Sequence, residues 1–252
     1  MRFLVLGPLE VIDDGGQPIP IAGAKERTIL AHLIANVDRV VPTDDLTDAL
    51  WGEDPPRTAE RTIRSYVSRL RRALEPGSGR EPTEILRTRS DGYELMAAGP
   101  EIDAVRFEQL AGEGHRFLES GNPEEADRVL EQALDLWRGA AYQEYRYVGF
   151  GGSEGQRLEE LRRAAIEDRF DARLANGDAG SLVADLEGMV REEPLRERRW
   201  GQLMVALYRA GRQAEALQAF TRARAVLVDE LGIEPGPDLN GCKPRSSLTT
   251  PH

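Results

Sequence analysis

The sequence predicts an α+β domain followed by an all-α domain of helical repeats. In the first 97 residues, short extended segments alternate with three amphipathic helical segments and end in a hairpin pattern. From Asp103 to about Leu231 the apolar residues recur with the helical period. Glycine-containing turns repeat in this second part, with 34 residues between Gly177 and Gly211. We expect domains at 1–97 and 98–239, then a disordered tail at 240–252.

The N-terminus has the alternation of a small antiparallel sheet. Apolar residues run from Phe3 to Leu6, break at Gly7-Pro8 and resume at Leu9. Residues 13–18 have turn composition, and Ile19–Ile21 are expected to return to an extended conformation.

Three helices are expected next. The first covers about Ala24–Asn36. The second begins at Thr43, the expected N-cap, with acids in its first turn and Gly52 as its stop signal. The third covers Thr58–Leu74, "TAERTIRSYVSRLRRAL".

The third helix is amphipathic. Ile63, Val67, Leu70 and Leu74 fall within about 60° of one another on a helical wheel and predict its buried stripe. The opposite face consists of arginines and small hydroxyl residues: Arg61, Ser65, Ser68 and Arg72, flanked by Arg64 and Arg69.

A basic hairpin follows a loop at residues 75–82. In "ILRTRSDGYEL" (Ile85–Leu95), two strands are expected around an Asp91-Gly92 turn. Arg87 and Arg89 are two residues apart and therefore share one strand face. Three helices with a basic third helix and an adjoining basic hairpin predict a winged helix-turn-helix.

The charge is distributed unevenly. Between Arg57 and Ser90 nine arginines face four acids, a local charge of +5 in a chain of net charge −11. Because salt screens charges beyond about 8–10 Å, a DNA phosphate near this segment would experience mainly the arginines. An arginine-rich helix face is often merely solvated. Here every basic residue is arginine, whose planar fork can pair with guanine or phosphate, and a basic hairpin adjoins it, so we favour double-stranded DNA as the partner.

The second half contains three related segments: Leu118–Leu134, Leu174–Val190 and Tyr208–Arg224. Their turn glycines, Gly121, Gly177 and Gly211, and the 34-residue period are typical of tetratricopeptide repeats. The first spacing is 56 residues, which leaves room for an insertion holding residues 138–155. The aromatic stretch "AYQEYRYVGF" (Ala141–Phe150) is expected to pack in the core, although it could instead line a ligand-binding surface.

The sequence has no pattern of an enzyme, a cofactor site or a metal site. "GFGGSEG" (Gly149–Gly155) lacks the preceding strand and final Lys-Ser/Thr of a phosphate-binding loop, so a flexible connector is expected. The single cysteine, Cys242, excludes an internal disulfide and a cysteine-based zinc site, and we interpret His32, His115 and His252 as ordinary residues. With no membrane-length apolar stretch and no signal peptide pattern, the expected location is the cytoplasm, at the nucleoid.

"RTIRSYVSRLRRALEP" followed by "ILRTRSDGYEL" resembles the recognition helix and wing of OmpR/PhoB-type winged helices. The receiver domain usual in such response regulators is replaced by a repeat domain ending in "LGIEPGPDL". This pairing resembles the Streptomyces antibiotic regulatory protein family, with its bacterial transcriptional activation domain, over about Phe3–Leu239.

The resemblance implies a transcriptional activator that binds promoter direct repeats, generally as two copies, and recruits RNA polymerase holoenzyme to secondary-metabolite genes. It places helix contacts at Arg61, Arg64, Ser65, Tyr66, Arg69 and Arg71, and a wing contact at Arg89, with Arg87 beside it. The helical wheel puts Tyr66 and Arg71 near the buried stripe and favours Arg72 instead.

One feature departs from the family pattern. Such domains usually continue into a further apolar helix, whereas residues 240–252 here are polar, so apolar surface on the last repeat could stay exposed or the tail could be foreign to the protein. Two alternative functions stay open: a repeat-based interaction adaptor, and a regulator that binds an effector in its repeat domain.

Overall fold

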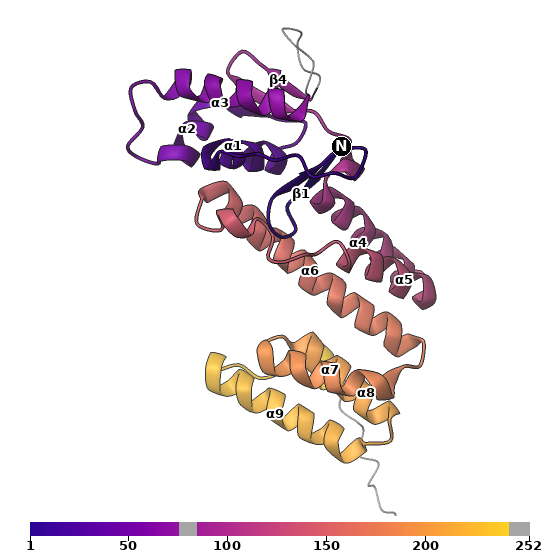
Figure 1. Ribbon diagram of the computed structural model, residues 1–252. Helices are drawn as coiled ribbons and strands as arrows, with labels where there is room; N and C mark the ends of the chain where they lie inside the picture. The colour runs from indigo at the N-terminus through magenta and orange to yellow at the C-terminus, as the bar shows by residue number, and fades with distance from the viewer. Residues whose placement is uncertain (76–84, 242–252) are drawn as a thin grey trace, which may run out of the picture. The chain divides into compact units, whose positions relative to one another are not determined.

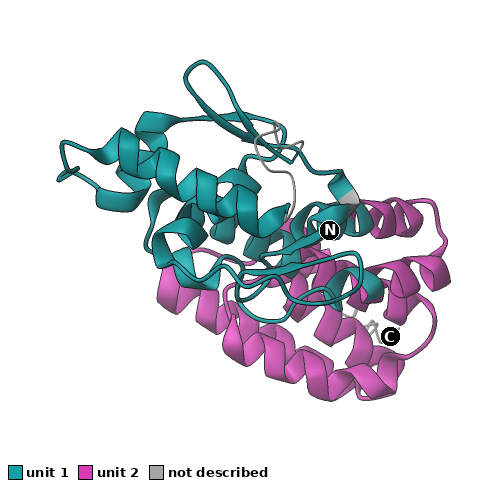
Figure 2. Ribbon diagram, turned by 45° about the horizontal axis from the view of Figure 1, so that its top comes forward, with its two compact units in different colours: residues 1–111, 132–163 teal, residues 112–131, 164–252 magenta. Residues whose placement is uncertain are grey.

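The computed structural model describes residues 1–75 and 85–241. Most of the expected loop at 75–82, and all of the expected tail beyond residue 241, lie outside these ranges. The chain forms two compact units, residues 1–111 with 132–163 and residues 112–131 with 164–252 (Figure 2). The domain boundaries at 97 and 239 remain predictions. Across the described ranges, no helix is both long and apolar enough to cross a membrane.

The N-terminal sheet of unit 1 is confirmed but is shorter than expected. Strands β1 (Arg2–Leu4) and β2 (Glu10–Ile12) pair antiparallel, with Phe3 opposite Val11. The expected third extended segment forms only an isolated bridge from Pro18 to Ile12 and a hydrogen bond from Ile19 N–H to the Val11 carbonyl, 2.8 Å. Pro18 and Pro20 have no N–H group, so they cannot extend a ladder.

The predicted winged helix is present in unit 1 (Figure 1). Its elements are α1 (Ala24–Ala35), β3 (Val40–Pro42), α2 (Thr43–Trp51), α3 (Ala59–Leu74), β4 (Leu86–Thr88) and β5 (Gly92–Leu95). The three strands form an antiparallel sheet in the order β3-β5-β4. Helix α3 packs against α1 and α2 through the predicted stripe, and Ile63, Val67, Leu70 and Leu74 are all buried.

Two local expectations were wrong. Thr43 is the first residue of α2 and Pro42 is its N-cap, because the carbonyl of Asp91 accepts the Thr43 N–H at 3.0 Å and replaces a side-chain cap. The hairpin connection is Arg89–Asp91, and Gly92 is already part of β5, opposite Pro42. Gly92 is required there because a Cβ atom would lie 2.0 Å from the Val41 carbonyl oxygen.

Residues 99–241 are mostly helical, as predicted for the second part of the chain. The elements are η1 (Gly99–Glu101), α4 (Asp103–Glu119), α5 (Pro123–Leu134), η2 (Gln143–Tyr145), α6 (Gly149–Ala175), α7 (Ala179–Glu192), α8 (Glu197–Arg209), α9 (Gln213–Leu231) and α10 (Pro237–Gly241). Gly121, Gly177 and Gly211 all have positive φ and follow α4, α6 and α8. In each turn the next residue donates its N–H five residues back, as in a Schellman cap.

The segment "GFGGSEG" is the start of α6, and the expected flexible connector is wrong. Its glycines permit close packing: a Cβ atom at Gly151 would lie 2.5 Å from the Tyr145 carbonyl oxygen. The aromatic stretch before it packs as expected, because Tyr142 and Tyr145 are buried and Phe150 stacks on His32 at 4.3 Å. Tyr147 is the exception, with 88% exposure.

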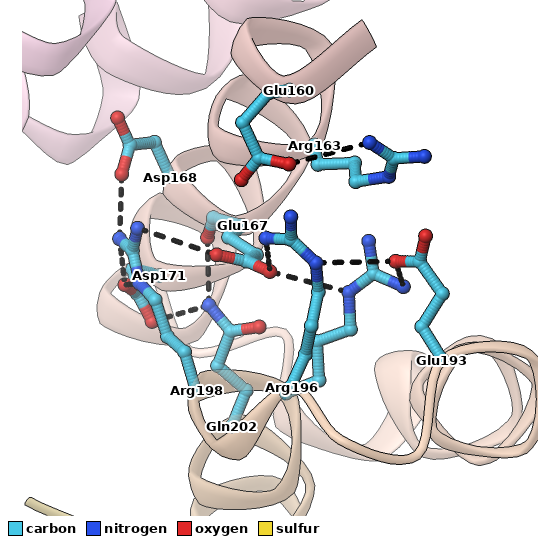
Figure 3. A network of polar contacts seen from close by, with 10 residues as sticks. Glu160, Arg163, Glu167, Asp168, Asp171, Glu193, Arg196, Arg198 and Gln202 are labelled. Atoms are coloured by element: carbon cyan, nitrogen blue, oxygen red, sulfur yellow. Dashed lines mark hydrogen bonds and ion pairs between the residues drawn. The ribbon is translucent and has the colours of Figure 1, made fainter. Parts of the chain in front are cut away.

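Unit 2 contains a dense network of charged side chains between α6 and α8 (Figure 3). Glu167 and Asp168 on α6 are buried, and Arg198 reaches the Asp168 carboxylate at 2.5 Å. Arg199, also buried, donates to Glu167 at 3.3 Å. Because an unpaired buried charge is strongly destabilising, the buried Glu167, Asp168 and Arg199 depend on their partners in this network.

The exposed side of α9 is partly apolar. Leu217, Val228 and Leu231 are exposed, whereas Leu239 of α10 is buried in the core of unit 2.

We expect His32 to make stability depend on pH. Burial lowers the pKa of His32 from 6.5, and the charge of Asp45 raises it by less. The unfolded chain then binds a proton more tightly than the folded chain, so stability is lost as the pH falls through about 6.5. In thermal unfolding followed by circular dichroism, His32→Phe should reduce this loss, and an unchanged pH profile would refute the assignment.

Gly92→Ala should destabilise the wing by about 1–3 kcal/mol, because the added Cβ collides with the backbone of β3. The matched control is Gly188→Ala in α7, where a Cβ meets nothing within 4 Å. That change should stabilise the protein by about 0.5–1 kcal/mol through helix propensity. Urea unfolding of both variants distinguishes the two effects, and equal effects would contradict the role of Gly92.

Candidate nucleic-acid interface

Helix α3 presents the predicted polar face to solvent. The exposed members are Arg61, Arg64, Ser65, Ser68, Arg69 and Arg72. Tyr66 and Arg71 are half-buried, in agreement with their place beside the apolar stripe. Arg87 and Arg89 of the hairpin are exposed too. The chain thus brings all ten predicted residues to α3 and the adjoining hairpin, but their surroundings differ.

Three arginines have no partner among the described residues. The side chains of Arg61, Arg72 and Arg87 form no hydrogen bond or ion pair with other residues of the ranges 1–75 and 85–241. Within the same described ranges, the one partner of Arg64 is Glu60, which forms an exposed ion pair with it at 3.2 Å, one helical turn back. Such a surface pair contributes at most about 1 kcal/mol, so these four guanidinium groups can readily exchange water or Glu60 for phosphate or base edges.

Arg69 is held by a buried acid. Its Nη1 donates to Oε1 of Glu26 at 2.6 Å, and its guanidinium lies 5.3 Å from the Tyr66 ring. Glu26 belongs to α1 and is only 6% exposed. The pair therefore links α3 to α1 and fixes one edge of a guanidinium that still reaches solvent.

Arg71 connects α3 to the wing. Its Nε donates to the Leu86 carbonyl at 2.9 Å, and its Nη2 donates to Oγ1 of Thr88 at 2.7 Å. These bonds occupy the Nε–Nη2 edge of its guanidinium, so Arg71 positions β4 beside α3.

Arg89 is anchored within the wing. Its Nε donates to Oε2 of Glu94 at 2.6 Å, and Glu94 is nearly buried. Glu94 is also the cross-strand partner of Arg87. This one acid therefore adjoins both arginines of the wing. Burial raises the pKa of Tyr93 on the same strand, and the nearby charges of Arg64 and Arg71 lower it by less.

Sequence reasoning missed Glu26, Glu94 and Thr88. Glu94 could have been predicted from the sequence. When the hairpin is centred one residue earlier than the expected Asp91-Gly92 turn, Glu94 lies opposite Arg87 on the neighbouring strand. Glu26 lacked any local signal, since its partner is 43 residues away in the chain. Thr88 lacked a local signal too, because its hydrogen bond with Arg71 depends on how β4 lies beside α3.

Unit 2 carries a separate cavity of about 510 Å³ beside α6, α8 and α10. Its apolar lining includes Leu174, Val205 and Leu239, and its polar lining includes Arg198 and Glu197. The size lies in the range of small-molecule sites. In the ranges that the structure covers, no group of three or more potential metal ligands occurs.

Two family models together match nearly all of the chain. The model described as "Transcriptional regulatory protein, C terminal" matches residues 16–95, and the "Bacterial transcriptional activator domain" matches residues 102–244.

Curated regulators are similar to the chain over the same length. Regulatory protein DnrI of Streptomyces peucetius is 37% identical, with 93% of this chain and 88% of the relative covered. Transcriptional regulatory protein EmbR of Mycobacterium tuberculosis is 38% identical over 97% of this chain and 63% of its own length. Regulatory protein AfsR of Streptomyces coelicolor is 37% identical over 97% of this chain and 24% of its own length. The chain therefore spans most of DnrI but less than two thirds of EmbR and AfsR.

A solved structure has the same fold. Mycobacterium tuberculosis EmbR in complex with a low-affinity phosphopeptide superimposes with a TM-score of 0.90 and 38% identity, covering 96% of this chain and 63% of that one. The winged helix, the helical activator domain and the similarity to these regulators show that the chain belongs to the Streptomyces antibiotic regulatory protein family of transcriptional regulators.

Proposed function

We propose that this regulator inserts α3 into the major groove of promoter DNA and places the β4–β5 wing on the adjacent backbone. It binds direct repeats as two copies side by side and recruits RNA polymerase holoenzyme through its activator domain. Its targets are genes of a secondary-metabolite cluster.

The observation that carries the DNA-binding part is the outward face of α3. Four of its arginines are exposed there, and the opposite face is fully buried in the core. The helix is about 24 Å long at 1.5 Å per residue, which suits an α-helix in a major groove about 12 Å wide.

The contacts divide by their surroundings. Arg61, Arg64, Ser65, Ser68 and Arg72 are the candidates for base and phosphate contact on the helix, and Arg87 and Arg89 are those on the wing. Arg69 is a contact fixed from behind by Glu26. Arg71 acts mainly by holding β4, and Tyr66 supports Arg69.

The direct repeats, the polymerase and the target genes are inferred from the family. Two relatives of the same family, DnrI and AfsR, are named regulatory proteins of Streptomyces. Selection of bound sequences from random DNA, followed by genome-wide footprinting, tests the target. Two half-sites in the same orientation would support paired binding, and a single half-site would contradict it.

A second candidate function is effector binding by unit 2, and the cavity is the observation that favours it. A compound bound there should raise the melting temperature of the parent chain and fail to raise that of Val205→Trp, which fills the cavity. Equal stabilisation of both would exclude this site.

Arg61→Ala and Arg72→Ala should each weaken binding to the selected duplex by about 1–3 kcal/mol if the side chain reads a base. Affinity for an unrelated duplex should fall much less. Arg116→Ala, which removes an exposed arginine from α4, is the charge-matched control and should leave both affinities nearly unchanged. Fluorescence anisotropy at fixed salt measures all of these affinities, and parent-like binding by both helix variants would refute the assignment.

Arg87→Ala should weaken binding to all duplexes alike, because a wing contact to phosphate carries no sequence information. Its logarithmic salt dependence should flatten by about one unit, since one fewer counterion is released. Arg89→Ala should do the same and also lower the melting temperature, because it leaves nearly buried Glu94 unpaired. A selective loss for one DNA sequence would instead assign base reading to the wing.

A further inference from the structure

Glu26 is a buried carboxylate directly behind the surface proposed to meet DNA. Its carboxylate repels phosphates, so electrostatics alone would favour a neutral residue at this position. The site nevertheless holds an acid that is only 6% exposed, and Nη1 of Arg69 lies 2.6 Å from it. General affinity for DNA therefore does not explain why an acid occupies this position.

The backbone of α1 is shaped to keep this carboxylate in place. Gly23 is the N-cap of α1, and a Cβ atom there would lie 1.8 Å from Oε2 of Glu26. The backbone of Gly23 is extended, with φ −87° and ψ 133°, so any residue could adopt its conformation. Glycine suits this position because the Glu26 side chain folds back over it and occupies the space that a Cβ atom would need.

The effect of this contact is to restrict Arg69. One edge of its guanidinium is bound to Glu26, and the group lies 5.3 Å from the Tyr66 ring, yet 57% of the side chain is still exposed. A free arginine side chain loses rotamer entropy when it is fixed. A guanidinium that is oriented before DNA binds loses less rotamer entropy on binding. Its fixed N–H donors can form hydrogen bonds only with bases whose acceptors lie in matching positions.

We propose that Glu26 is a positioning residue for DNA recognition, which orients the Arg69 guanidinium and so raises the preference for the correct sequence over other DNA. The inference rests on the proposed function. It differs from a purely structural link between α1 and α3, which would alter stability without altering sequence preference.

Glu26→Gln and Glu60→Gln separate the two effects. Each removes one carboxylate charge that pairs with an arginine of α3. Glu60 is exposed, and among the described residues it pairs only with Arg64. Both variants should bind a scrambled duplex more tightly than the parent does. Only Glu26→Gln should lower the ratio of affinities for the selected duplex and the scrambled duplex, by about tenfold, the size of one lost base contact. Glu60→Gln should keep this ratio within about twofold.

Gly23→Ala tests the same contact without changing any charge. Its Cβ displaces the Glu26 carboxylate, so the affinity ratio should fall while binding to the scrambled duplex stays at the parent level. In a double-mutant cycle, Glu26→Gln should have no further effect on the ratio once Arg69 is alanine.

The ratio is measured on one preparation of the full chain, so an inactive fraction cancels and a loss of stability does not imitate the result. Parent-like ratios for both Glu26→Gln and Gly23→Ala would overturn the inference, as would an equal drop for Glu60→Gln. If the parent chain itself shows no preference for any selected duplex, the proposed function fails, and this outcome is distinct from the failure of the role of Glu26.

Discussion

The burial of one face of α3 is the constraint on which the candidate interface depends. Ile63, Val67, Leu70 and Leu74 have almost no contact with solvent, and their 3.6-residue periodicity determines which side chains point outward. Burying such side chains contributes on the order of 1.5–3 kcal/mol each, far more than the exposed ion pairs on the opposite face. The orientation of the arginines therefore follows from the core.

Within this frame, the arginines of the interface are supported to different degrees. Arg71 joins α3 to β4, and Arg69 and Arg89 each contact a buried or nearly buried acid. Arg61, Arg72 and Arg87 are left without such a partner among the described residues. A surface of this kind combines fixed donors, which favour selectivity, with adaptable ones, which favour affinity.

The two units solve their packing problems differently. The winged helix uses a small sheet whose close approach requires Gly92, whereas unit 2 connects its helices through left-handed glycine turns and buries a network of opposite charges. Some of the many acids in the second half are thus paired with arginines of the same network. The net charge of −11 says little about the surface that meets DNA.

By itself the sequence determined the fold class, the third helix with its buried and exposed faces, the wing, and the glycine turns, because each depends on local periodicity or turn chemistry. It misplaced the cap of α2 and the hairpin turn, and it mistook the start of α6 for a connector, because contacts with Asp91, β3 and Tyr145 decide those conformations. Only the tertiary structure brought Glu26 to Arg69, across 43 residues of chain. Partners that far apart leave no periodic trace, and packing of α1 against α3 alone brings them together.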